Sequence, residues 1–282
     1  MKTIKIDEQT KIAYSQHGSH MNTKDCVVLF IHGIGNYHGV WNTLISQLPS
    51  ELACISIDLP GNGFSSRTKV KYDINYYTSC IFEFIKKMGF KKVVLAGHSM
   101  GGMIALSCAL KKPSWLHKLV LFAPAGFEKY TPSEATLYKS AISFGNFLNL
   151  DEIQIQQSIQ AAFYTSHSAM QPIIDDLKNI LQGHNRVDYR AMLEECIHSM
   201  LDTDLFDSLK DIQTPTLVFF GENDMLIPNR FLHPVSTKEI AVKGSAQIPY
   251  ARLITYPLTG HFVQIEQAMA CAKEMLHFIF KN

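Results

Sequence analysis

Residues Val93–Gly102 read VVLAGHSMGG and join an apolar run to a glycine-rich turn. The run VVLA fits a buried strand, because strands of a parallel sheet are covered on both faces and are apolar throughout. The pentapeptide Gly97–Gly101, GHSMG, follows at once, and Met100–Leu110 is rich in the helix formers Met, Ala and Leu. A GxSxG pentapeptide between a strand and a helix places its serine on a sharp, exposed turn. The pattern therefore predicts that Ser99 is a nucleophile.

Similar apolar runs lie on both sides of this stretch, and each fits one buried strand. They are Val27–Ile31, Ala53–Ile57, Leu119–Ala123, Thr216–Phe220 and Arg252–Tyr256. Two alternating segments near the start, Thr3–Asp7 and Lys11–Ser15, fit an antiparallel edge pair. Between the runs lie helical patterns such as Ile74–Met88 and Ala268–Phe280. This alternation predicts a mostly parallel sheet with helices on both faces.

One long segment interrupts the alternation of strands and helices. Residues 127–209 stand between two strand runs and contain no clear strand pattern of their own, whereas windows such as 151–162 and 171–181 fit helices. A connection of about eighty residues is far longer than an ordinary crossover between strands. We predict that residues 127–209 form a helical lid on a core made of residues 1–126 and 210–282.

Two polar segments follow the last two predicted strands, the first of them directly and the second after two residues. They are Gly221–Asp224, GEND, and Thr259–Phe262, TGHF. Both therefore lie at the carboxyl ends of strands, where open α/β sheets bind their ligands. A serine nucleophile needs a general base and an acid that orients it. The candidates in these two segments are the imidazole of His261 for the base, and the carboxyl groups of Asp224 and its alternative Glu222 for the acid.

The order Ser99, Asp224, His261 along the chain is that of the α/β-hydrolase triad. Together with the strand pattern and the place of the lid, it makes the chain resemble the α/β-hydrolase superfamily from end to end. The resemblance implies an α/β fold, with a mostly parallel eight-stranded sheet flanked by helices and a helical lid inserted after strand six. It also implies that Ser99 is the catalytic nucleophile, His261 the general base and acid, and Asp224 the group that orients His261.

The segment His32–Asn36, HGIGN, resembles the HG-type oxyanion loop of that family. The resemblance implies that the backbone N–H groups of Ile34 and Met100 receive the negative oxygen that develops during acyl transfer. One such preorganised donor contributes about 2.7–4 kcal/mol in the transition state. We expect His32 to support its loop and His98 to point away from the nucleophile.

Composition and motifs leave no reason to expect a cofactor, a metal ion or a nucleic acid. The 26 Lys and Arg residues nearly balance 25 Asp and Glu residues, whereas nucleic-acid-binding proteins usually carry a basic excess. The six cysteines form no CxxC pair, and the glycines near Gly33 lack the spacing of a nucleotide-binding loop. The expected partner is a small-molecule ester alone, bound by a monomer or a homodimer.

Hydropathy indicates a protein without a membrane span. The chain has no apolar run of 18 residues, and its first residues alternate in polarity instead of forming the apolar stretch of a signal peptide. We therefore expect a cytoplasmic location and reduced cysteines.

The resemblance favours hydrolysis of a carboxylic ester with a small or medium apolar acyl group, through an acyl-enzyme intermediate. The GHSMGG turn is similar to that of carboxylesterases and monoacylglycerol-type lipases. Four aromatic residues are candidates to bind the substrate, namely Trp41, Phe144, Phe163 and Phe262.

Two alternatives stay open. Carbon–carbon hydrolases that act on meta-cleavage products share the lid position, but they usually carry Asn before the nucleophile, Trp after the catalytic histidine and an arginine in the lid. This chain has His98 and Phe262 at the first two positions, and Arg186 or Arg190 could supply the third. The other alternative is a ligand sensor or partner-binding protein that retains the triad without sustained turnover.

Overall fold

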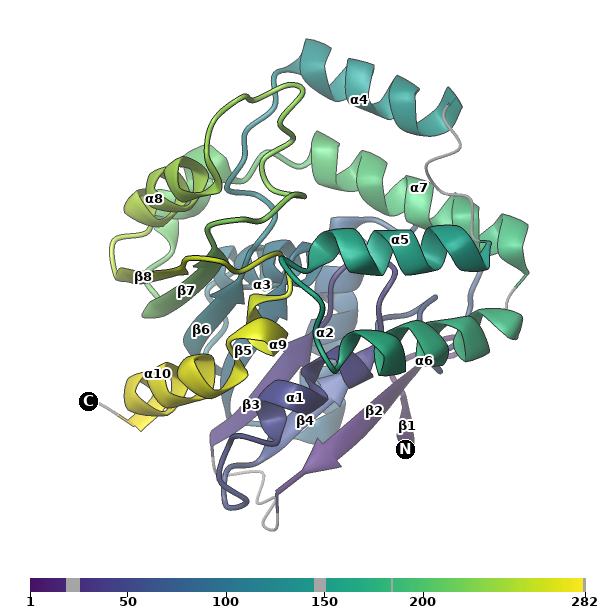
Figure 1. Cartoon of the computed structure of the whole chain (residues 1–282). Coiled ribbons are helices and arrows are strands. Elements are labelled where there is room, and N and C mark those ends of the chain that lie inside the picture. The colour runs from purple at the N-terminus through teal and green to yellow at the C-terminus, as the bar shows by residue number, and fades with distance from the viewer. Residues whose placement is uncertain (19–25, 145–150, 184, 281–282) are drawn as a thin grey trace.

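The computed structural model describes residues 1–18, 26–144, 151–183 and 185–280, and its centre is one eight-stranded sheet (Figure 1). The strands are β1 (Lys2–Lys5), β2 (Lys11–His17), β3 (Cys26–Ile31), β4 (Cys54–Ile57), β5 (Lys92–His98), β6 (Leu116–Phe122), β7 (Thr216–Gly221) and β8 (Ala251–Tyr256). Their spatial order is β1-β2-β4-β3-β5-β6-β7-β8. The predicted fold class is confirmed.

Strand direction follows the hydropathy pattern. β1 pairs with β2 and β2 pairs with β4 in antiparallel fashion, whereas β4, β3, β5, β6, β7 and β8 run parallel to one another. The central strands are buried along nearly their whole length, while most residues of edge strand β1 are exposed. Because the central strands are parallel, their carboxyl ends share one edge of the sheet.

Helices cover both faces of the sheet (Figure 1). On one face pack α2 (Ile74–Met88), α3 (Met100–Leu110) and α8 (Thr237–Gln247), and on the other lie α1 (Asn42–Ile45), α9 (Val263–Glu266) and α10 (Ala268–Phe280). The ends of α2 follow from local chemistry, because Asp73 accepts a hydrogen bond from the Tyr76 N–H and Gly89 takes a left-handed conformation with φ of 71°. Two short 3₁₀ helices, η1 (His38–Trp41) and η2 (Phe206–Asp211), complete the core.

Among the described residues between β6 and β7 lie four α-helices, which we call the helical insertion. They are α4 (Pro132–Phe144), α5 (Glu152–Ala162), α6 (Met170–Gln182) and α7 (Arg186–Asp202). In Figure 1 they lie above the edge at which the parallel strands end. Two of them match the helical windows predicted at 151–162 and 171–181. Within the described part of residues 127–209, the structure contains no strand, as expected.

Hydrogen bonds fasten the α6–α7 half of the insertion to the loops of the core. The Tyr37 hydroxyl donates to Asp176, the Tyr189 hydroxyl donates to Asn62 Oδ1 at 3.3 Å, and the Tyr72 N–H donates to a carboxylate oxygen of α7 at 2.9 Å. In the described part of the chain, every helix is too short or too polar to cross a membrane.

Candidate active site

Ser99 occupies the turn between β5 and α3, with φ of 53° and ψ of −119°. Few residues other than glycine adopt a positive φ, so the turn holds the serine in a strained conformation. The turn depends on its glycines. A Cβ at Gly97 would lie 2.3 Å from the Gly101 carbonyl oxygen, and a Cβ at Gly101 would lie 2.3 Å from the Ile31 carbonyl oxygen. The sequence thus produces the sharp strand-to-helix turn predicted for it.

His261 and Asp224 are in direct contact. The Nδ1 atom of His261 lies 2.6 Å from Asp224 Oδ2, and both side chains are almost fully buried. The second carboxylate oxygen of Asp224 accepts hydrogen bonds from the N–H groups of Leu226 at 2.7 Å and Ile227 at 3.1 Å. With Nδ1–H donated to Asp224, the Nε2 atom of His261 is left as a proton acceptor.

Glu222, the alternative acid, is bonded elsewhere. One of its carboxylate oxygens accepts from Lys238 at 2.9 Å and from the Thr255 hydroxyl at 2.7 Å. These hydrogen bonds lower the pKa of Glu222, with the bond from Thr255 as the largest cause. Of the two acids considered, the structure brings Asp224 to His261.

His98, which was expected to point away from the nucleophile, lies beside His261. Its ring centroid is 4.7 Å from that of His261 and 5.1 Å from that of Phe262, and its Nε2–H donates to the His261 carbonyl oxygen at 3.1 Å. Burial, reinforced by the neighbouring His261, holds the pKa of His98 well below its ordinary value. The neutral His98 ring therefore fixes the backbone of the loop that carries His261. Only the fold reveals this contact, since the two residues are distant in sequence.

The loop after β3 packs against the serine turn. A Cβ at Gly33 would lie 3.0 Å from Ser99 Cβ, so the next residue, Ile34, borders the same cavity as Ser99. Met100 is the first residue of α3, where backbone N–H groups have no partner within the helix. The two predicted oxyanion donors thus belong to segments that meet at Ser99.

His32 supports this loop, as expected. Its Nδ1–H donates to the Gly33 carbonyl oxygen at 2.7 Å, and its Nε2 accepts from the Leu59 N–H at 3.0 Å. Burial lowers the pKa of His32 to about 4, which keeps the ring neutral near pH 7. The Asn36 side-chain amide donates to the Ile34 carbonyl oxygen at 3.0 Å and holds the following peptide in place.

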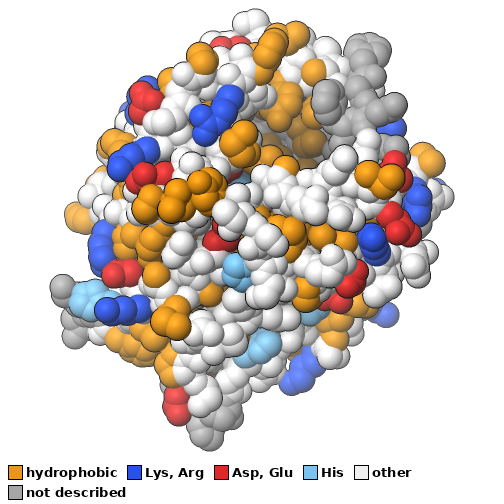
Figure 2. Space-filling model, in the orientation of Figure 1, with side chains coloured by type: hydrophobic (Ala, Val, Ile, Leu, Met, Phe, Trp, Pro, Cys, Tyr) orange, Lys and Arg blue, Asp and Glu red, His pale blue; other side chains and the backbone are white. Residues whose placement is uncertain are grey.

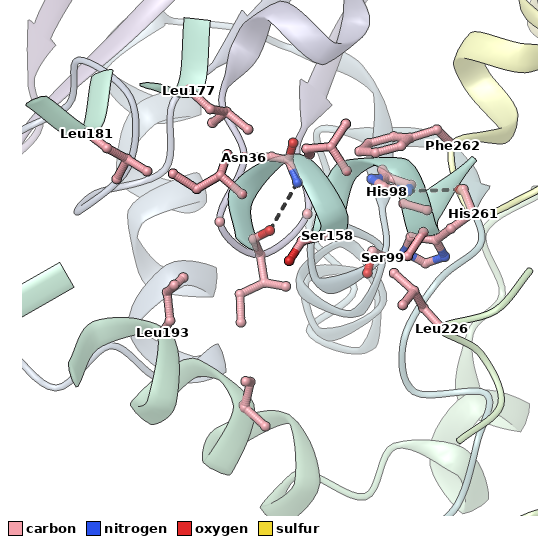
Figure 3. Close-up of a pocket in the computed structure, with 18 of the residues that line it drawn as sticks. Asn36, His98, Ser99, Ser158, Leu177, Leu181, Leu193, Leu226, His261 and Phe262 are labelled. Atoms are coloured by element: carbon pink, nitrogen blue, oxygen red, sulfur yellow. Dashed lines mark hydrogen bonds between the residues drawn. The ribbon is translucent and has the colours of Figure 1, made fainter. Parts of the chain in front are cut away.

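A cavity of about 390 Å³ opens above Ser99. Its walls come from the core loops and from α5, α6 and α7, and most are apolar: Ile34, Ile155, Ile159, Ala161, Ala162, Leu177, Leu181, Leu193, Ile197, Leu226 and Phe262. No Lys, Arg, Asp or Glu is among the described residues that line it. Figure 3 shows Ser99 and His261 at one end and Leu177, Leu181 and Leu193 toward the other. The space-filling view shows a hollow with apolar side chains inside it (Figure 2).

The four aromatic candidates for substrate binding occupy different places. Phe262 lines the cavity. Trp41 is fully buried and packs on Phe30 and Phe122, outside the cavity lining. Phe163 is buried outside the lining too, with its ring 5.0 Å from that of Phe262. The side chain of Phe144 lies outside the described residues.

Sequence reasoning missed most of the residues that line the cavity. The aliphatic residues of α5, α6 and α7 are ordinary helix residues, and no motif distinguishes those that face the cavity from those that face the core. Ser158 and Asn36 supply polar atoms to the lining and were also not predicted. Across the described residues, no group of three or more His, Cys, Asp or Glu side chains could hold a metal ion.

Comparison with known proteins relates this chain to one family. A family model described as the alpha/beta hydrolase fold matches residues 27–268. Human monoacylglycerol lipase ABHD6 is 23% identical over 261 residues, which cover 89% of this chain and 74% of that protein. The uncharacterized hydrolase YugF of Bacillus subtilis strain 168 is 24% identical over 284 residues, covering 94% and 93% of the two chains.

The solved structures agree on the fold. A probable hydrolytic enzyme from Pseudomonas aeruginosa PAO1 superposes with a TM-score of 0.82 at 20% sequence identity, covering 99% of this chain and 93% of that one. At this identity the similarity shows a shared sheet and helix arrangement.

Proposed function

The chain belongs to the α/β hydrolase fold family, and from this premise we propose that it is a serine hydrolase that cleaves a carboxylic ester with an apolar acyl group. The observation that carries the proposal is the contact between His261 and Asp224 at the end of an apolar cavity that Ser99 also borders. Monoacylglycerol lipase ABHD6, which is similar over most of this chain, acts by its name on an ester.

In the proposed reaction, the Ser99 hydroxyl oxygen attacks the ester carbonyl carbon while His261 Nε2 accepts the hydroxyl proton. Asp224 stabilises the imidazolium that forms, and the N–H groups of Ile34 and Met100 donate to the negatively charged oxygen. The carbon–oxygen bond to the alcohol then breaks, and His261 returns its proton to the leaving alcohol. A water molecule, deprotonated by His261, hydrolyses the acyl-Ser99 ester and restores the hydroxyl.

The shape of the cavity supports an apolar acyl group. From Ser99 the cavity runs between α5, α6 and α7 toward Leu177, Leu181 and Leu193 (Figure 3). An aliphatic chain attached to Ser99 would bury its methylene groups there, each of which contributes about 0.8 kcal/mol when removed from water. We propose that the helical insertion acts as a lid in this sense: it supplies the walls that select the acyl group.

The carbon–carbon hydrolase alternative has less support. Besides the His98 and Phe262 departures, neither Arg186 nor Arg190 is among the described residues that line the cavity. An anionic substrate of the meta-cleavage type would therefore enter a cavity without a cationic side chain, where burying its charge is costly.

The proposal is tested by turnover of p-nitrophenyl esters from acetate to dodecanoate. We expect sustained release of nitrophenol, with kcat/KM highest for a medium acyl chain and abolished in Ser99→Ala. A single burst without sustained release would instead indicate a sensor that retains its triad. Absence of both burst and turnover across the series would contradict ester hydrolysis.

A further inference from the structure

The end of α5 lies against the loop that carries His261. The Ala162 carbonyl oxygen accepts hydrogen bonds from the His261 N–H at 2.8 Å and from the Phe262 N–H at 3.3 Å. A Cβ at Gly260 would lie 2.7 Å from both the Ala162 carbonyl oxygen and the Tyr164 nitrogen. Only glycine allows two backbone segments to approach so closely.

A single carboxylate bridges these two segments. Glu266, on α9, accepts the Gly260 N–H through Oε1 at 2.8 Å and the Tyr164 N–H through Oε2 at 3.0 Å. Gly260 directly precedes His261, and Tyr164 lies two residues after the end of α5 at Ala162. Hydrogen bonds to an ionised acceptor are stronger than those between neutral groups. Glu266 therefore links the His261 loop to the segment that follows α5, in addition to the bonds made by Ala162.

The electrostatic surroundings place Glu266 close to the His261–Asp224 pair. The pKa of Glu266 is raised overall, mainly by burial and to a smaller extent by the Asp224 charge, although the N–H bonds from Tyr164 and Gly260 and the neighbouring His261 lower it. The carboxylate is thus partly shielded from water, and the two N–H groups that it accepts stabilise its charged form. A glutamine there offers one acceptor and one donor, and the donor would face an N–H group.

We propose that Glu266 is a positioning residue: by bridging Gly260 and Tyr164 it ties the helical insertion to the His261 loop and holds the imidazole in line with Ser99. The inference rests on the proposed role of His261. A displacement of about 1 Å in a catalytic group can lower the rate by about 100-fold. Loss of the bridge therefore reduces the chemical step more than it reduces substrate binding.

Three variants test the bridge: Glu266→Gln, Glu266→Ala and the control Glu274→Gln. Glu274 is a carboxylate on α10 that pairs with Arg252 at the surface, away from the cavity. On p-nitrophenyl acetate we expect both Glu266 variants to lose about 10–100-fold in kcat, with KM changed less than about threefold. In hydrogen exchange, the peptides that contain Gly260 and Tyr164 should exchange at least about tenfold faster than in the wild type. The control should match the wild type in both measurements.

An unchanged kcat in Glu266→Gln overturns the proposal, and so does faster exchange spread evenly over the whole chain, which indicates general destabilisation. If Glu266→Ala does not fold, the glutamine variant decides alone. If the wild type hydrolyses no ester, the proposed function fails. In that case the bridge is tested by two other measurements on the Glu266 variants: hydrogen exchange at Gly260 and Tyr164, and the rate at which a fluorophosphonate labels Ser99. If both match the wild type, the bridge is contradicted.

Discussion

At the scale of the residue, Ser99 and His261 are held by backbone contacts as much as by their side chains. Ser99 stands at a positive φ between glycines that admit no side chain. The backbone of His261 is bonded on two sides, through its N–H to Ala162 and through its carbonyl oxygen to His98. This preorganisation places the proposed nucleophile and base at one end of the cavity before substrate arrives.

Replacing Asp224 by asparagine should lower kcat steeply without unfolding the protein. The amide oxygen can still accept the Leu226 and Ile227 N–H groups, so the amide nitrogen must face His261 Nδ1. The ring then protonates at Nε2 and cannot take the Ser99 proton. In a serine protease the same change costs about 10⁴-fold.

Glu222→Gln is the matched control for Asp224→Asn. Its carboxylate bonds Lys238 and Thr255, so kcat/KM should stay near that of the wild type. Thermal melting should show both variants folded. A large loss in Glu222→Gln with little loss in Asp224→Asn would move the acid to Glu222.

His32 predicts how stability depends on pH. Its pKa of about 4 in the folded protein lies below the ordinary value of 6.5, so between these values the unfolded chain binds the proton and the folded chain does not. The contribution of His32 to the free energy of unfolding is therefore complete above about pH 6.5. It decreases by about 3 kcal/mol as the pH drops toward 4.

The measurement for His32 is urea unfolding at pH 7 and pH 4.5. We expect His32→Gln to be less stable at pH 7, because it disturbs the bonds to Gly33 and Leu59, and to lose less stability on acidification than the wild type does. An equal pH dependence in the two proteins would show that His32 titrates normally when folded.

At the scale of the element, sequence periodicity predicted the parts of the chain with one dominant local signal. The strand runs and α2 are of this kind, since Asp73 and Gly89 mark the ends of α2. In contrast, α7 was not predicted, because polar and apolar residues alternate irregularly along Arg186–Asp202 and its bonds to the core join residues distant in sequence. The same tertiary packing determines which side chains line the cavity.

Leu181 on α6 allows a test, at this scale, of where the acyl chain lies in the cavity. It is buried and lines the end of the cavity away from Ser99 (Figure 3). Leu181→Phe should shorten the cavity, so kcat/KM for decanoate esters should fall by about tenfold or more while acetate esters change little. Gln182→Phe, which adds the same ring to an exposed position of α6, is the control. Equal losses for both ester lengths would show that the acyl group lies elsewhere.

At the scale of the whole molecule, parallel strands bring distant segments together at one edge of the sheet. Ser99 follows β5, Asp224 follows β7 and His261 follows β8, so the sequence order of the strands was enough to predict that these residues lie at one edge of the sheet. It was not enough to predict His98 or Glu266, whose partners come from the His261 loop and the helical insertion. The His98 contact depends on how two core loops pack, and the Glu266 bridge depends on how the insertion packs on the core. Neither arrangement has a signature in local sequence.

The most direct test of the account is covalent labelling of Ser99. A fluorophosphonate reacts only with a serine whose proton is removed by a base, so intact-mass measurement should show one adduct on the wild type, and peptide mapping should place it on Ser99. Ser99→Ala should remain folded and gain no adduct. An unlabelled wild type, or labelling that persists in Ser99→Ala, would contradict the assignment of Ser99 as the nucleophile.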